Sequence, residues 1–119
     1  MDVVLVVEDE AIIRMLLAEA IEDAGLAVVE ANNADAAIAE LSRRTDIRAV
    51  VTDVRMPGSM DGIALASWMR AHKPEIPVII CSGIDTRVDV TAINPAIIRI
   101  VSKPYLPDDI ARLVAVAIQ

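Results

Sequence analysis

The feature that most constrains this chain is a regular alternation between short aliphatic runs and longer segments with helical spacing. Uninterrupted aliphatic runs are typical of strands buried on both faces, because a half-exposed strand alternates apolar and polar residues. Strands joined through helices run parallel, so the alternation predicts an α/β domain built on a parallel sheet. The five predicted strands are Val3–Val7, Ala27–Glu30, Ala49–Thr52, Val78–Cys81 and Ile97–Val101.

Five helices are predicted to follow these strands. The first has apolar residues at positions i, i+3, i+4 and i+7, and Gly25 suits its C-terminal end. The fourth is the least regular, because it is rich in β-branched residues that form helices poorly. The predicted segments are about Glu10 to Ala24, a stripe from Ala34 to Leu41 capped by Asn32-Asn33, about Asp61 to Ala71, Asp85–Ile93, and a helix that begins at Pro107.

The strand composition also predicts the order of the sheet. The first, third and fourth runs are almost continuously aliphatic and are expected at its centre, whereas the second is short and the fifth carries Arg99. Right-handed crossovers leave few topologies open. We therefore expect a flavodoxin-like (βα)5 three-layer sandwich whose parallel five-stranded sheet has the order 2-1-3-4-5.

Composition narrows the class of protein. The 119 residues fit one domain, over 1–119, and 11 Lys and Arg against 18 Asp and Glu give a formal charge of −7. This charge opposes binding to nucleic acid or to an anionic membrane. The single cysteine, Cys81, excludes an internal disulfide, and the first apolar run is too short for a signal peptide or membrane span. We expect a cytoplasmic domain.

Polar residues stand where the predicted strands end. The first strand is followed by Glu8-Asp9, the third by Asp53, the fourth by Ser82 and the fifth by Lys103. The carboxyl ends of parallel strands lie along one edge of a sheet, where open α/β folds bind their ligands. Each residue alone also fits a solvated strand end or a turn, but together they predict one cleft.

The charges of this cleft predict its chemistry. Two carboxylates about 4 Å apart repel by roughly 4 kcal/mol at an effective dielectric near 20, so three of them need more than one lysine as counter-charge. Hard carboxylate oxygens with open positions suit Mg²⁺. A carboxylate beside Mg²⁺, a lysine and a hydroxyl can accept a phosphoryl group. The residues therefore predict an aspartyl-phosphate site with Asp53 as the nucleophile.

Four short motifs carry a resemblance to a known family. The chain resembles the receiver domain of two-component response regulators over essentially its full length. The motifs are Val6-Val7-Glu8-Asp9-Glu10, Val51-Thr52-Asp53-Val54-Arg55-Met56-Pro57-Gly58 with Asp61-Gly62 after it, Cys81-Ser82-Gly83, and Ser102-Lys103-Pro104-Tyr105.

The resemblance implies a role for each site residue. Asp53 would accept the phosphoryl group from a histidine kinase or a phosphotransfer protein. Mg²⁺ would be held by Asp9, Asp53 and the backbone carbonyl of Arg55, with Glu8 assisting through water. Lys103 would pair with the phosphoryl group. The family usually has a cis peptide bond before the proline, here the Lys103–Pro104 bond, which would aim the lysine. Ser82 would move to bond the phosphoryl group once it arrives.

The sequence departs from the family pattern at two positions. Ile100 stands where the family often has a rotating aromatic residue, so another element is expected to report phosphorylation. Arg55, two residues after Asp53, lies where the family tunes the lifetime of the phosphoryl group. A guanidinium there could contact a phosphate oxygen.

We expect a single-domain response regulator that is a switch and not an enzyme. Its output would come from docking to a downstream protein through residues 84–119, as a monomer or as a phosphorylation-dependent dimer. Two alternatives stay open. One is a phosphohydrolase with an aspartyl-phosphate intermediate, although such enzymes typically carry a second acid where this chain has Arg55. The other is a pseudo-receiver, a binding module that is not phosphorylated.

Overall fold

The computed structural model describes residues 2–56, 58, 60–83 and 90–119. Strands and helices alternate along these residues, as the aliphatic runs predict. The strands are β1 (Val3–Val7), β2 (Ala27–Ala31), β3 (Ile47–Asp53), β4 (Val78–Ser82) and β5 (Ile97–Ser102). The helices are α1 (Ala11–Asp23), α2 (Ala34–Arg43), α3 (Gly62–His72), α4 (Val90–Ile93) and α5 (Pro107–Ile118).

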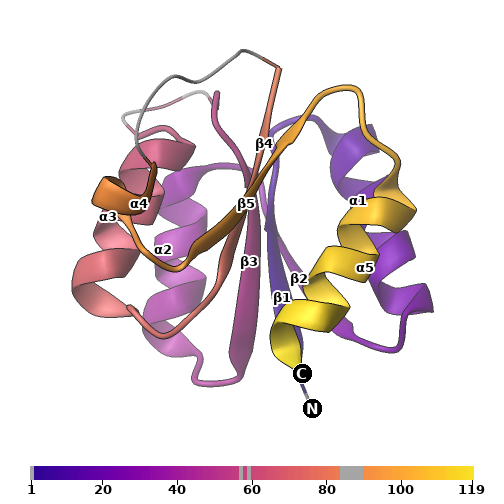
Figure 1. The fold of residues 1–119 in the computed structure, drawn as a ribbon, viewed down its shortest axis with the longest axis horizontal. Helices are drawn as coiled ribbons and strands as arrows, with labels where there is room; N and C mark the ends of the chain where they lie inside the picture. The colour runs from indigo at the N-terminus through magenta and orange to yellow at the C-terminus, as the bar shows by residue number, and fades with distance from the viewer. Residues whose placement is uncertain (1, 57, 59, 84–89) are drawn as a thin grey trace.

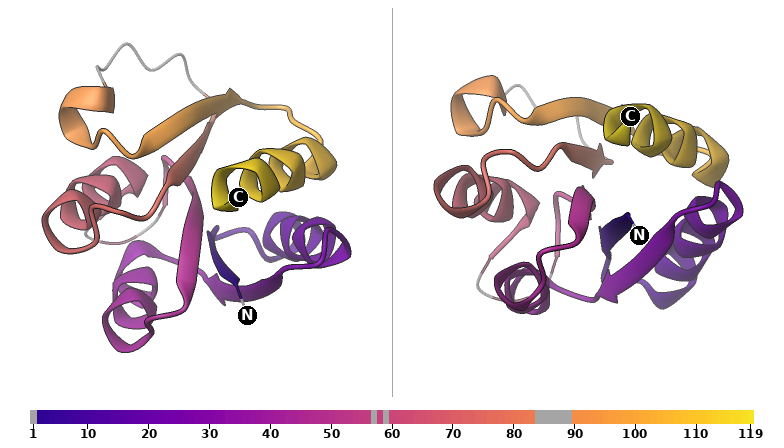
Figure 2. Two further views of the ribbon diagram at one scale, coloured as in Figure 1. Left: turned by 60° about the horizontal axis from the view of Figure 1, so that its bottom comes forward. Right: turned by 90° about the horizontal axis from the view of Figure 1, so that it is seen from below.

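The five strands form one parallel sheet in the order β2-β1-β3-β4-β5. Helices α1 and α5 cover one face of the sheet, and α2, α3 and α4 cover the other (Figures 1 and 2). The predicted flavodoxin-like, three-layer fold and strand order are confirmed, with the three most aliphatic strands at the centre.

The core is aliphatic and lies on both faces of the sheet. Because side chains alternate along a strand, Leu5 and Ile80 pack toward α2 and α3, whereas Val6 and Ile79 pack toward α1 and α5. All five residues of β1 are buried, as expected for a strand between two neighbours and two helical layers. Among the helices of the described residues, none combines the length and apolar character needed to cross a bilayer.

The ends of several elements differ from the prediction. Strand β3 begins two residues early, at Ile47, because parallel pairing with Val3 continues past a register irregularity. Strands β2, β3, β4 and β5 each end one residue later than predicted. Of the predicted helix Asp85–Ile93, Val90–Ile93 is helical, and residues 84–89 lie outside the described part of the chain.

Local side chains explain how the chain enters two of its helices. The Asn33 Oδ1 accepts a hydrogen bond from the amide of Ala36 at 2.8 Å, and the Asp61 Oδ1 accepts one from the amide of Ala64 at 2.8 Å. Such caps satisfy helix amides that have no partner within the helix. Helix α1 ends before Gly25, whose φ of 94° suits glycine.

Candidate functional site

The carboxyl edge of the sheet brings together three acidic side chains from two strand ends. Glu8 and Asp9 follow β1, and Asp53 is the last residue of the neighbouring strand β3. One carboxylate oxygen from each of the three lies within 4.8 Å of the other two. Hard oxygen donors at this spacing fit a divalent cation such as Mg²⁺.

Asp53 is held by hydrogen bonds on both carboxylate oxygens. Its Oδ1 accepts from the backbone amide of Val54 at 2.8 Å, and its Oδ2 accepts from the Nζ of Lys103 at 2.7 Å. The side chain is 11% exposed, so a small part of it reaches solvent. Asp53 is therefore fixed in orientation and accessible to a reactant.

Glu8 is the buried member of the acidic cluster, with a relative exposure of 2%. Its Oε2 accepts a hydrogen bond from the backbone amide of Asp9 at 3.0 Å, and its Oε1 lies 3.9 Å from the Lys103 Nζ. Burial, and next the charge of Asp53, raise the pKa of Glu8 to about 8, although Lys103 opposes the shift. The raised pKa means that the metal-free site disfavours a third negative charge beside Asp53, which a bound cation would offset.

Lys103 and Ser82 come from the other side of the site. Burial lowers the pKa of Lys103, but the hydrogen bond and charge of Asp53 outweigh it and raise that pKa above its ordinary value. The backbone amide of Lys103 donates to the Ser82 carbonyl at 2.9 Å, and Ser82 is buried at the end of β4. The Lys103–Pro104 bond is cis, as the resemblance implied.

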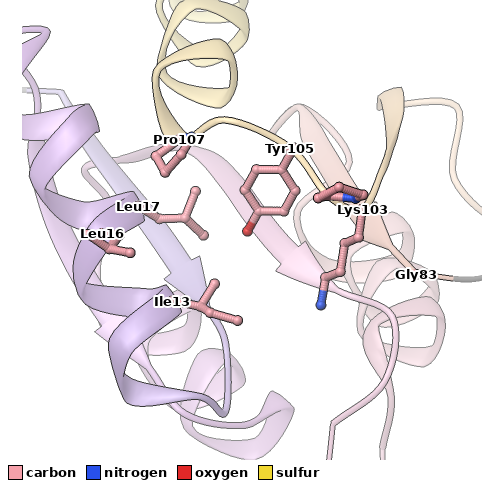
Figure 3. A pocket seen from close by; sticks show the side chains of 8 residues that line it. Ile13, Leu16, Leu17, Gly83, Lys103, Tyr105 and Pro107 are labelled. Atoms are coloured by element: carbon pink, nitrogen blue, oxygen red, sulfur yellow. The ribbon is translucent and has the colours of Figure 1, made fainter.

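An apolar groove of about 440 Å³ runs beside Lys103, between α1 and the segment after β5. Figure 3 shows the ring of Tyr105 between Lys103 and the α1 side chains Ile13 and Leu17.

Burial, and next the charge of Asp53, raise the pKa of the Cys81 thiol to about 12. The thiol therefore stays protonated at neutral pH and packs as a core residue.

The remaining site candidates lie at the margin of the cluster. The Arg55 side chain is exposed, and Ile100 is half-buried against the core on the face of the sheet that α2 and α3 cover. Sequence analysis missed Arg14, which donates through Nη1 to the backbone carbonyl of Glu8 at 2.8 Å. Its place on the first turn after the acidic pair was the signal that could have identified it.

Comparison with known proteins agrees with this geometry. The family model described as the response regulator receiver domain matches residues 4–115. The DNA-binding transcriptional regulator NtrC of Salmonella typhimurium is 35% identical over 118 residues, which are 98% of this chain and 24% of NtrC. The chain spans about a quarter to a third of the length of the curated relatives it matches.

Solved structures agree over nearly the whole chain. A response regulator receiver protein from Pseudomonas putida has a TM-score of 0.85 at 28% identity, covering 96% of this chain and 95% of its own. TrrA from Thermotoga maritima, a response regulator protein solved in complex with Mg(2+)-BeF, has a TM-score of 0.85 at 27% identity, with coverage of 98% and 99%. The chain belongs to the response regulator receiver domain family of two-component systems.

Proposed function

We propose that this chain accepts a phosphoryl group on Asp53 from the phosphohistidine of a histidine kinase or of a phosphotransfer protein. A carboxylate oxygen of Asp53 forms the new bond to phosphorus, the donor's phosphorus–nitrogen bond breaks, and the imidazole keeps the electron pair. The observation that carries the proposal is the 2.7 Å contact between Asp53 Oδ2 and Lys103 Nζ inside a cluster of three carboxylates.

The donor set also supports a Mg²⁺ requirement. We assign the ion to Asp9, Asp53 and the backbone carbonyl of Arg55, with Glu8 assisting through water. When bound, the ion neutralises negative charge on the acidic cluster and on the incoming phosphoryl oxygens. The Mg(2+)-BeF complex of the Thermotoga relative supports Mg²⁺ as the ion.

Lys103 and Ser82 respond to the new group in this proposal. Lys103 already donates to Asp53, and its ammonium can turn to a phosphoryl oxygen without leaving the site. Ser82 is the last residue of β4, and its hydroxyl would donate a hydrogen bond to the phosphoryl group. We expect Ser82 and the residues after it to have two arrangements, one with and one without the hydrogen bond to the phosphoryl group. The added charge then favours the first.

Output is proposed through residues 84–119, in the cytoplasm. In the described part of this segment, Ile98 and Val116 are large apolar side chains exposed on β5 and α5, which supports docking to a protein. Ile100 replaces the usual aromatic, so the change is expected to reach this face without ring rotation. The stand-alone regulator and the phosphorylation-dependent dimer stay predictions.

The test compares Asp53, the proposed acceptor, with Asp61, which caps α3. The protein is incubated with Mg²⁺ and a small phosphodonor such as acetyl phosphate, and acid-stable, hydroxylamine-labile phosphate is measured. Asp53→Asn should lose the label, because the amide keeps an oxygen for the Val54 amide but lacks the nucleophile. Asp61→Asn is the matched control, since asparagine caps α3 as well as aspartate does.

Three results would contradict the proposal. Equal labelling of Asp53→Asn and the unchanged protein would move the acceptor elsewhere. Absence of label in the unchanged protein would favour the pseudo-receiver, whereas steady turnover of a phosphate monoester would favour the phosphohydrolase.

A further inference from the structure

We propose that Arg14 is a positioning residue that orients the Glu8–Asp9 peptide unit and so sets the affinity of the acidic cluster for Mg²⁺. The inference rests on the proposed function, because it concerns the cation site assigned there. Arg14 lies on the first turn of α1 and does not itself belong to the carboxylate cluster.

The Arg14 guanidinium is held between two elements. Its Nη1 donates to the Glu8 carbonyl at 2.8 Å, and its Nε donates to Glu30 Oε1 at 3.0 Å. Glu30 lies on β2, the strand that pairs with β1. The Arg14 side chain is 20% exposed and Glu30 is 47% exposed, so the Glu8 contact is the more shielded of the two. Glu30 therefore aims the guanidinium at the end of β1.

The contact fixes the peptide unit that carries Asp9. The carbonyl of this unit belongs to Glu8 and accepts from Arg14, and its N–H belongs to Asp9 and donates to Glu8 Oε2 at 3.0 Å. One residue earlier, the Glu8 amide donates to the Ala31 carbonyl at 3.0 Å. The main chain is thus tied on both sides of Glu8, and the direction in which Asp9 leaves the strand follows from these bonds.

The start of α1 explains why the arginine is needed. Helices α2 and α3 begin with Asn33 and Asp61, whose side chains cap the first turn. Helix α1 begins after Glu10, whose side chain makes no capping hydrogen bond within the described residues. The junction between β1 and α1 therefore lacks the usual side-chain anchor. Arg14 supplies an anchor from inside the helix.

Charge and positioning make opposite predictions for this residue. Arg14 is a cation near a cation site, so its removal by Arg14→Met would strengthen Mg²⁺ binding if only its charge mattered. If Arg14 orients the Glu8–Asp9 unit, the same change weakens binding. Loss of a residue that orients metal ligands typically costs about tenfold or more in affinity. The sign of the change separates the two roles.

The experiment measures the Mg²⁺ dissociation constant by calorimetry for the metal-free protein, Arg14→Met, Arg14→Lys and Arg44→Met. Arg44 is the matched control, because it makes two 2.9 Å hydrogen bonds to Asp46 before β3, at the opposite edge of the sheet. We expect the dissociation constant to rise about tenfold in Arg14→Met, to rise less in Arg14→Lys, and to stay unchanged in Arg44→Met. Urea unfolding reports the stability of each variant.

A second readout needs no metal. Amide hydrogen exchange at Asp9 in the metal-free protein should speed up in Arg14→Met but not in Arg44→Met, because only the first change frees the Glu8–Asp9 peptide unit. An unchanged or lower dissociation constant in Arg14→Met, or equal weakening in Arg44→Met, would overturn the inference. Arg14→Lys keeps the charge and applies the same test if Arg14→Met does not fold. Failure of the unchanged protein to bind Mg²⁺ would instead contradict the proposed function.

Discussion

The chain leaves β3 and β4 in two different ways, although both strands end at the same site. After β3, a Cβ placed on Gly62 would lie 1.9 Å from the backbone oxygen of Asp53, and the Gly62 amide donates to the Val54 carbonyl at 2.8 Å. After β4, a Cβ placed on Gly83 would meet the Cδ of Lys103 at 3.8 Å, an ordinary contact. Among the described residues, Gly62 after β3 is closely packed, whereas Gly83 after β4 has space for a methyl group.

The side chains show the same contrast. Asp53 has both carboxylate oxygens bonded at the end of a central strand. Lys103 follows the edge strand β5, where Ile98 and Arg99 are exposed, and its own side chain is 28% exposed. A fixed Asp53 suits a template that a cation must fit, and the more exposed Lys103 suits a group that responds to a ligand. Asp53 is therefore the fixed part of the site, and Lys103 is the part with more freedom to move.

The largest expected effect comes from filling the close contact after β3. Gly62→Ala should lower the free energy of unfolding by about 3 kcal/mol or more, because the new methyl group meets backbone that cannot turn aside. Helix propensity alone would predict the opposite sign, since alanine in a helix is favoured over glycine by about 1 kcal/mol. Urea unfolding measures the change.

The matched control is Gly83→Ala. Its methyl group would have 3.8 Å to the nearest described atom, so stability and Mg²⁺ affinity should change little. Gly62→Ala should weaken Mg²⁺ binding as well, because relief of the contact displaces the end of β3. If the two variants lost equal stability, the contrast between the packing after β3 and after β4 would be wrong.

The residues that end the strands could be predicted from sequence, and the contacts that fix them could not. Parallel topology alone brings Asp53 and Lys103 to one edge, and Arg99 is enough to mark β5 as an edge strand. The burial of Glu8 depends on what packs around it and has no local signal. Arg14 lies on an amphipathic helix, where an arginine normally faces water, and its partner Glu30 is sixteen residues away.

The next effect is a pH dependence of stability that comes from Glu8, the buried acid of the cluster. Folding raises the Glu8 pKa from 4.5 to about 8, mainly by burial, so the folded protein holds a proton that the unfolded chain releases. The resulting stability is present below 4.5 and is lost as pH rises toward about 8. The free energy of unfolding of the metal-free protein should therefore fall across this interval, by at most about 1.4 kcal/mol per pH unit for one proton.

Two comparisons isolate Glu8 in this titration. Glu8→Gln should flatten the slope, because glutamine stays neutral at every pH. Saturating Mg²⁺ should flatten it as well, since a nearby cation favours the carboxylate. The measurement is urea unfolding at several pH values. A stability that rises with pH through the same interval would show that Glu8 is ionised in the folded, metal-free protein.

The smallest expected effect comes from Asn94, which precedes β5 at the end of that strand away from the site. Asn94 is buried, its Nδ2 donates to the Ala66 carbonyl in α3 at 3.0 Å, and its Oδ1 accepts from the Ala96 amide at 2.8 Å. Asn94→Ala removes both bonds and should lower the free energy of unfolding by about 1–2 kcal/mol. These bonds hold the start of β5, away from the carboxyl edge where Lys103 lies.

Asn94→Ala also tests whether the two sides of the site are independent. The change loosens the connection between α4 and β5 but touches neither Glu8 nor Asp53, so Mg²⁺ affinity should stay within about twofold of the unchanged protein. Weakening as large as that of Gly62→Ala would mean that the connection to β5 helps to hold the acids in place. An unchanged affinity with reduced stability would show that the acids after β1 and β3 keep their positions when the connection to β5 is loosened. This result would agree with the different packing after β3 and β4.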